Sequence, residues 1–169
     1  MKKTIFILAV ILGCQTMAFS QKFIFVDTDY ILKNIPAYEA AQDQLNQLSK
    51  QWQQEIEAVY QEVASLYKEF QTESVFLSGE MRTKKEEAII EKEKQAKLLQ
   101  QKYFGPEGEM SKRQNTLIQP IQDQVTAVLR EIAREEGINA IFDKSTGLLY
   151  LDPKLDKSDQ VLERLGYKR

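Results

Sequence analysis

The sequence of 169 residues contains no histidine and only one cysteine, Cys14. Without histidine, the chain has no imidazole for general base catalysis, for a Ser-His-Asp or Cys-His relay, or for metal binding. One cysteine excludes a disulfide within the chain and a zinc site of several thiolates. The chain also has no glycine-rich phosphate loop. These absences favour a protein that is not an enzyme and that needs no cofactor and no metal.

Residues that interrupt helices are also scarce, with seven glycines and four prolines in the whole chain. Residues 37–78 and 80–104 contain neither. Because glycine and proline are the strongest local breakers of regular structure, these two stretches predict long helices.

Clustered basic residues are missing as well. The chain has 23 basic and 25 acidic residues, and its pI is about 5.4. If Lys2 and Lys3 are removed with a leader, 21 basic residues remain against the 25 acidic ones. Nucleic-acid binding needs clustered Lys and Arg to pair with phosphates, so we do not expect it.

The first 20 residues have the pattern of a cleaved signal peptide. Lys2 and Lys3 precede a short apolar run, and residues 18–20 (Ala-Phe-Ser) form a small-x-small cleavage site. The apolar run is shorter than the roughly 20 residues of a membrane-spanning helix, so the mature chain is expected outside the cytoplasm. An alternative is a lipoprotein site at residues 11–14 (Ile-Leu-Gly-Cys), with Cys14 acylated.

Apolar and small residues recur every three or four positions between 38 and 70, which is the spacing of a single apolar stripe on a helix. They are Tyr38, Ala41, Leu45, Leu48, Trp52, Ile56, Val59, Val63, Leu66 and Phe70. At 1.5 Å per residue, a helix over 37–74 would be about 57 Å long. A helix of this length with one apolar stripe must pack on another helix, and Trp52 is expected to be structural.

A second helical run is predicted over 80–136. Residues 75–79 (Val-Phe-Leu-Ser-Gly) separate the two runs, with Ser78 as a helix N-cap. A short connection makes consecutive helices antiparallel neighbours, so 37–136 should form a helical hairpin with its tip at 75–79. Two places should disturb the second run: Gly105, Pro106 and Gly108 should break it, and Pro120 should kink it. They are the candidate hinge of the hairpin.

The two ends of the chain predict a small β/α region formed by 21–36 and 137–169. Residues 22–27, 138–143 and 148–151 read as short strands, and a last helix follows Asp156 or Ser158. Three short strands make a thin core for one chain, so an oligomer that pools the strands of several chains is expected. Its candidate core residues are Phe23, Phe25, Ile141 and Phe142.

This order of parts resembles the Skp (OmpH-like) family of periplasmic chaperones over the whole mature length. The resemblance rests on the strand at 22–27, the hairpin, the segment 138–143 (Ile-Asn-Ala-Ile-Phe-Asp) and the segment 155–165. Residues 26–32 and 103–109 (Tyr-Phe-Gly-Pro-Glu-Gly-Glu) look like a branch of the family that carries an insertion.

The resemblance implies a mostly α protein with a small β body, in which a homotrimer assembles a short-stranded sheet and three coiled-coil arms project around a cavity. It implies an ATP-independent holdase that binds unfolded outer-membrane β-barrel proteins in the periplasm. The best-known member is strongly basic, whereas this chain is acidic, so contact with lipid or lipopolysaccharide is doubtful. A coiled-coil structural or adaptor protein of the cell envelope is the alternative.

Two sets of hairpin residues are candidates for contact with unfolded clients. Val75, Phe76 and Leu77 lie at the predicted tip, where the alternative is that they close the hairpin by packing on Met81. The second set has helical spacing and could instead belong to the hairpin interior; its members are Tyr60, Tyr67 and Phe70. A calcium site at Asp27, Asp29 and Asp143 does not match an EF-hand loop, and helix capping explains these carboxylates better.

Overall fold

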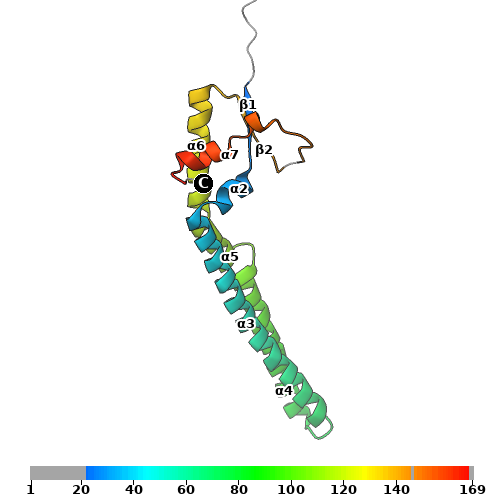
Figure 1. Cartoon of the computed structure of the whole chain (residues 1–169). Helices are drawn as coiled ribbons and strands as arrows, with labels where there is room; N and C mark the ends of the chain where they lie inside the picture. Colours follow the sequence, from blue (N-terminus) through cyan, green and yellow to red (C-terminus); the bar gives the residue numbers. More distant parts are fainter. Residues whose placement is uncertain (1–21, 146, 168–169) are drawn as a thin grey trace, which may run out of the picture. The chain divides into compact units, whose positions relative to one another are not determined.

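The computed structural model describes residues 22–145 and 147–167. The predictions for a signal peptide at 1–20 and for acylation of Cys14 lie outside these residues. The chain is mostly helical with one small sheet, as predicted (Figure 1). In chain order, the elements are β1 (Phe23–Val26), α2 (Thr28–Lys33), α3 (Pro36–Glu73), α4 (Gly79–Phe104), α5 (Glu109–Leu117), α6 (Gln119–Glu136), β2 (Ala140–Asp143), η1 (Pro153–Leu155) and α7 (Ser158–Arg164).

The described residues form two compact units, 22–31 with 126–167 and 32–125. The second unit contains residues 37–125 of the hairpin predicted over 37–136, and the last part of that range, 126–136, groups with the first unit. Its long helix α3 begins with Pro36 in the first turn, where proline is tolerated because the N–H that it lacks would have no helical partner. Helix α4 returns antiparallel beside α3, and α5 also packs on α3 (Figure 1). Ser78 caps α4 as predicted, because its hydroxyl accepts from the Met81 N–H.

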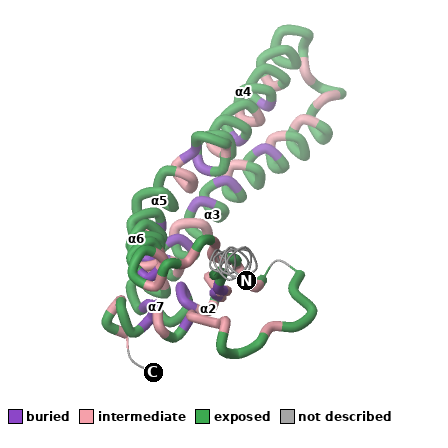
Figure 2. The backbone as a smooth tube through the Cα atoms, turned by 90° about the horizontal axis from the view of Figure 1, so that it is seen from above, coloured by how far each residue is buried: buried purple, intermediate pink, exposed green. Residues whose placement is uncertain are grey.

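The interior of the hairpin is a narrow seam between α3 and α4. The buried residues of these two helices recur at helical spacing, as the purple positions in Figure 2 show; they are Ala41, Leu45, Trp52, Ile56, Val63, Ile89, Ala96 and Tyr103. Trp52 lies flat against Tyr103, with ring centroids 4.9 Å apart and planes 3° apart. Phe104 meets Trp52 edge-on, and Met110 of α5 packs on the same cluster. Trp52 is therefore structural, as expected.

The second helical run is interrupted near the glycines and prolines that predicted a break, between α4 and α5 and between α5 and α6. A compact turn separates α4 from α5, with the Gly108 N–H donating to the Gly105 carbonyl over 2.9 Å. Both glycines are needed for this close approach. A Cβ at Gly105 would lie 2.4 Å from the Gln101 carbonyl oxygen, and one at Gly108 would lie 2.8 Å from that of Tyr103. A one-residue interruption at Ile118 separates α5 from α6, two positions before Pro120.

The first unit contains a two-stranded parallel sheet. Phe23 pairs with Ala140 and Val26 with Asp143. Parallel strands need a crossover connection, and here the whole segment between residues 26 and 140 makes it. One face of β1 is buried through Ile24 and Val26. The strand predicted at 138–143 begins two residues late, at Ala140. Just before it, the Asn139 N–H donates to the Lys22 carbonyl and the Asn139 side chain accepts from the Lys22 N–H.

The prediction of a strand at 148–151 is wrong. Leu149 is fully exposed and Tyr150 is 79% exposed, and this segment belongs to no strand. The other edge of β1 is taken by the next segment: Phe25 forms a bridge with Asp156, and the Lys157 N–H donates to the Phe25 carbonyl over 2.9 Å. An apolar run of high β-propensity forms a strand only where it can pair and pack, and residues 148–151 pair with neither strand of the two-stranded sheet.

A polar network joins β1 to the start of α7. The buried Ser158 hydroxyl donates to Asp156 over 2.6 Å and accepts from the Asp27 N–H over 2.8 Å. Lys144 lies between the carboxylates of Asp156 (2.9 Å) and Asp27 (3.4 Å). Burial by itself would raise the pKa of Asp156, but hydrogen bonds from Ser158 and Lys144 outweigh it and leave the pKa below its ordinary value.

We expect the replacement Asp156→Asn to lower the free energy of unfolding by about 1–3 kcal/mol near neutral pH, because it removes charge-assisted bonds to two partners. A carboxyl whose folded pKa is lowered stabilises above its unfolded pKa, and this contribution is lost as pH falls through the folded pKa. The deficit of the variant should therefore shrink below a pH of about 4.

Urea unfolding across this pH range measures the effect. The matched control is Asp123→Asn, whose exposed carboxylate accepts from Gln119 one helical turn away; it should change stability by less than about 0.5 kcal/mol. A deficit for Asp156→Asn that did not depend on pH would contradict this account of the network.

The turn between α4 and α5 gives a second prediction. We expect Gly105→Ala to lower the free energy of unfolding by about 1–3 kcal/mol, because the new methyl group would overlap a backbone carbonyl. In the control Gly79→Ala, the methyl group meets no atom within 4 Å, and the variant should be neutral or more stable by up to about 1 kcal/mol. Thermal unfolding followed by circular dichroism measures both. Equal stabilities for the two variants would mean that the turn yields easily, as a hinge would.

Candidate functional site

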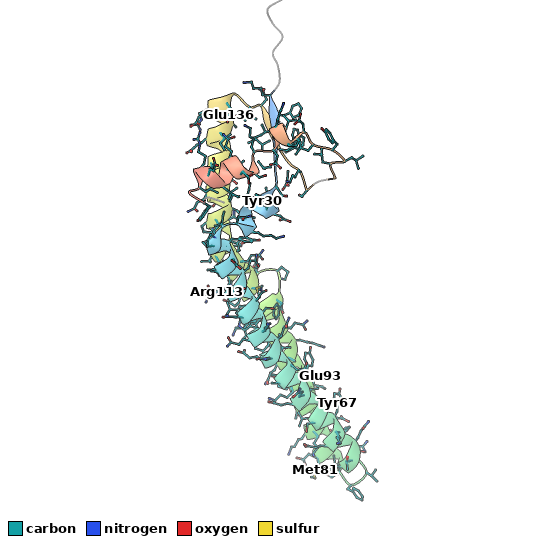
Figure 3. The ribbon with its side chains drawn as sticks, in the orientation of Figure 1. Tyr30, Tyr67, Met81, Glu93, Arg113 and Glu136 are labelled. Atoms are coloured by element: carbon teal, nitrogen blue, oxygen red, sulfur yellow. The ribbon has the colours of Figure 1, made fainter. Side chains whose placement is uncertain are left out.

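The tip of the hairpin presents apolar side chains to solvent. Val75 is 83% exposed and Phe76 is 88% exposed, while Leu77 is half-buried. Met81, the residue on which they might have packed, is itself 54% exposed and lies at the end of the hairpin in Figure 3. Val75 and Phe76 therefore contribute little to the hairpin interior.

Polar contacts close the tip turn. The Phe76 N–H donates to the Glu73 carbonyl over 2.8 Å, and the Ser74 N–H continues the helical pattern to Phe70. The Arg82 guanidinium donates to the Ser74 carbonyl over 2.8 Å and so ties the end of α3 to the start of α4. Since backbone and side-chain hydrogen bonds fix the turn, it does not depend on burial of its apolar residues.

The structure separates the three aromatic candidates on α3. Tyr60 is 39% exposed and Tyr67 is 46% exposed, and their spacing of seven residues puts them on the same side of the helix. Phe70 is half-buried and lies seven residues after the buried Val63, so it follows the seam.

Tyr67 and Tyr103 both bridge α3 and α4 through their hydroxyls. The Tyr67 hydroxyl donates to Glu93 over 3.0 Å, and the two residues lie together in Figure 3. The Tyr103 hydroxyl donates to Glu55 over 2.6 Å. In both cases the hydrogen bond to the carboxylate raises the tyrosine pKa above its ordinary value, so both hydroxyls remain donors at neutral pH.

Two ion pairs also connect α3 and α4, on the side of the hairpin where the Tyr103 hydroxyl bonds to Glu55. Lys92 pairs with Glu62, and Lys85 pairs with Glu73. Exposed pairs of this kind are worth little individually. They do fix which residues of α4 lie opposite which residues of α3.

A small groove lies between α3 and α4 beside Tyr60. Its volume is about 440 Å³ and its lining residues are Gln53, Ile56, Glu57, Tyr60, Gln100 and Phe104. The floor is apolar and aromatic, and the rim consists mainly of side-chain amides. Such a lining can accept an apolar side chain and bond to polar groups around it.

In the first unit, the sheet exposes a face of three phenyl rings. Phe23, Phe25 and Phe142 lie together, with ring centroids 5.5 to 6.4 Å apart. Phe23 and Phe142 are 45% and 49% exposed. The fourth expected body residue, Ile141, pairs with Ile24 and so lies on the other face of the sheet.

Some exposed apolar residues were not predicted from the sequence. Ile90 and Leu98 of α4 are 62% and 54% exposed, and Phe104 is 37% exposed. The doublet of Ile89 and Ile90 contained a signal, because two adjacent residues cannot both face a narrow seam. The exposure of Leu149 could not be foreseen, because the segment was predicted as a strand.

The acidic residues near β1 are occupied by local hydrogen bonds. Asp27 accepts from the Tyr30 N–H over 2.8 Å and so caps α2. Asp143 accepts from the Thr28 hydroxyl and from the Ser145 N–H. Across residues 22–145 and 147–167, no group of carboxylates is arranged to hold a metal ion.

Within the same two ranges, no helix is long and apolar enough to span a membrane.

Comparison with known proteins gives a consistent result. Residues 22–165 match the model of the family described as outer membrane protein (OmpH-like). A protein of Aquifex aeolicus (strain VF5), described only as uncharacterized, is 27% identical over 165 residues, which cover 98% of this chain and 96% of that protein.

A solved structure from Caulobacter crescentus CB15, described as a candidate outer membrane chaperone (OmpH-like), has the same fold. Its TM-score is 0.65 at 10% identity, with 86% of this chain and 83% of that chain covered. Because the family match extends from the first strand to the last helix, the chain belongs to the OmpH-like family.

Proposed function

We propose that the chain is an ATP-independent holdase chaperone of the periplasm, which binds unfolded outer-membrane β-barrel proteins and prevents their aggregation. Membership of the OmpH-like family supports this role. The observation that carries the proposal is the exposure of Val75 and Phe76 at the tip of a long hairpin. Exposed apolar groups of this kind mark contact sites for other molecules.

A purely structural tip would not need these two residues. Burying a side chain such as Val or Phe is worth about 1.5–3 kcal/mol, and most of this is forgone when the side chain stays in water. Polar bonds from Arg82 and Ser74 already close the turn. An unfolded polypeptide, which exposes apolar side chains along its length, is a partner that could cover the tip.

We further propose that the functional species is a homotrimer that holds its client between three hairpins. The exposed face of Phe23, Phe25 and Phe142 supports assembly, because a two-stranded sheet is marginal by itself. Three hairpins that each bind weakly can retain one chain through multivalency, without any tight site. A client held in this way can leave when its folded membrane form becomes available.

Binding alone suffices for this activity, and no ATP or other cofactor is part of the proposal. The location in the periplasm rests on the leader pattern of residues 1–20. Contact with lipopolysaccharide or nucleic acid is not proposed, because the chain is acidic and lacks a basic cluster.

The first test is client protection. A urea-unfolded outer-membrane β-barrel protein is diluted into buffer without ATP, with and without the mature chain, and aggregation is followed by light scattering. We expect suppression that saturates near one trimer per client. Sedimentation on the same sample should give the trimer and provides the control for folding. A folded trimer that suppressed nothing would contradict the holdase role and favour the alternative, an envelope adaptor that recognises one folded partner or is lipid-anchored through Cys14.

The second test concerns the tip. Replacing Val75, Phe76 and Leu77 with Ser should weaken client protection severalfold while sedimentation stays unchanged, because two of these side chains are exposed and the third is only half-buried. Leu98→Ser is the control, since it removes an apolar side chain that is 54% exposed from the shaft of α4. If the tip variant and the control protect the client equally well, Val75 to Leu77 have no special part in binding.

A further inference from the structure

The hairpin has two flanks of different chemistry on either side of the α3–α4 seam. On an ideal helix of 3.6 residues per turn, α3 residues that differ by seven or eleven positions share a flank. Glu55, Glu62, Glu69 and Glu73 lie on one flank, roughly 90° from the seam. Glu62 and Glu73 pair there with Lys92 and Lys85. We call this side the charged flank.

The opposite flank of α3 carries tyrosine and amide side chains. Its members are Gln53, Tyr60, Ala64, Tyr67 and Gln71, and Gln100 and Phe104 of α4 lie beside them around the groove described above. We call this side the tyrosine flank. Its interhelix contact is the hydrogen bond from Tyr67 to Glu93, and Glu57 is the one carboxylate in the groove lining. Four of the five glutamates in the distal half of α3 therefore lie on the other side.

We infer that the tyrosine flank is the surface along which the hairpin binds an extended segment of an unfolded polypeptide, an inference that rests on the holdase function proposed above. Side-chain amides and tyrosine hydroxyls both donate and accept hydrogen bonds. They can therefore pair with the peptide N–H and C=O groups that every unfolded chain presents. Apolar side chains of the same segment would enter the groove between Tyr60 and Phe104.

The distribution of charge favours this occupant. A segment laid on the charged flank would have to displace water from the two ion pairs, Lys85 with Glu73 and Lys92 with Glu62, which is unfavourable unless the charges find new partners. A segment laid on the tyrosine flank would mainly cover amide, hydroxyl and aromatic groups, which can pair with any sequence, and would meet carboxylates only at Glu57 and Glu93 among the flank residues described above. Tyrosine with small and amide side chains is also the composition of adaptable binding surfaces.

The size of the tyrosine flank fits a short extended segment. From Gln53 to Gln71 it is about 27 Å long at 1.5 Å per helical residue. An extended chain advances about 3.3 Å per residue, so this length matches roughly eight residues. The flank thus supplements the apolar tip, which offers two or three side chains.

Photo-crosslinking tests the inference with matched positions. p-Benzoylphenylalanine replaces Gln53, Tyr60 or Gln100 on the tyrosine flank and, as controls, Gln51, Glu69 or Gln95 on the charged flank. Each variant is mixed with a urea-unfolded outer-membrane β-barrel protein and irradiated. We expect at least fivefold higher yields from the tyrosine flank, about 1 kcal/mol in relative occupancy. Equal yields, or higher yields from the charged flank, would overturn the inference.

A pair of charge variants gives a second readout. Gln53→Glu places a carboxylate on the tyrosine flank, and Gln51→Glu places one on the charged flank. Each lies four residues before an existing glutamate, Glu57 or Glu55, so the repulsion within the helix is matched. We expect Gln53→Glu to weaken client protection several times more than Gln51→Glu does. Equal protection by the two variants would also overturn the inference.

The same experiments separate this inference from the proposed function. If the unmodified chain does not suppress aggregation, and a photo-crosslinker at position 76 of the tip captures no client, the holdase function itself fails. If suppression is normal but the two flanks behave alike, the holdase function stands and only the assignment of the flank is lost.

Discussion

The packing of α3 against α4 along a single narrow seam is the constraint on which the rest of the hairpin depends. A helix pair buries only the residues near the line of contact, so most of each helix surface remains in water. Trp52 and Tyr103 supply the largest flat contact of the seam. Because a thin interior cannot position two helices by itself, the ion pairs of Lys85 and Lys92 and the tyrosine hydroxyl bonds help to set their register.

The hairpin was predictable because its signals are local. The apolar spacing along α3, the Ser78 cap and the glycines at 105 and 108 each act within one or two helical turns. The sheet was less predictable, since strand formation depends on partners distant in sequence. Residues 148–151 have a strand-like composition, yet they join neither strand of the two-stranded sheet. The parallel pairing of β1 with β2 joins residues more than a hundred positions apart, which no local pattern specifies.

The candidate site, too, was predictable only where its signals are local. The tip could be located from the sequence, because Val75 and Phe76 lie in the short segment that separates the two helical runs predicted over 37–74 and 80–136. The two flanks could not be assigned without the structure, although the seven-residue spacing of Glu55, Glu62 and Glu69 is visible in the printed sequence. Their meaning depends on which α4 residues lie opposite, and this requires the register between the helices.

The polar closure of the tip turn has a consequence for how the protein can vary. Because Arg82, Ser74 and Ser78 hold the turn without help from its apolar residues, the folding of the hairpin and the chemistry of its end are largely independent. Positions 75 and 76 can therefore be exchanged for other side chains while the scaffold stays the same. Selection or design could therefore change the side chains that the tip presents to solvent without altering the helices that carry it.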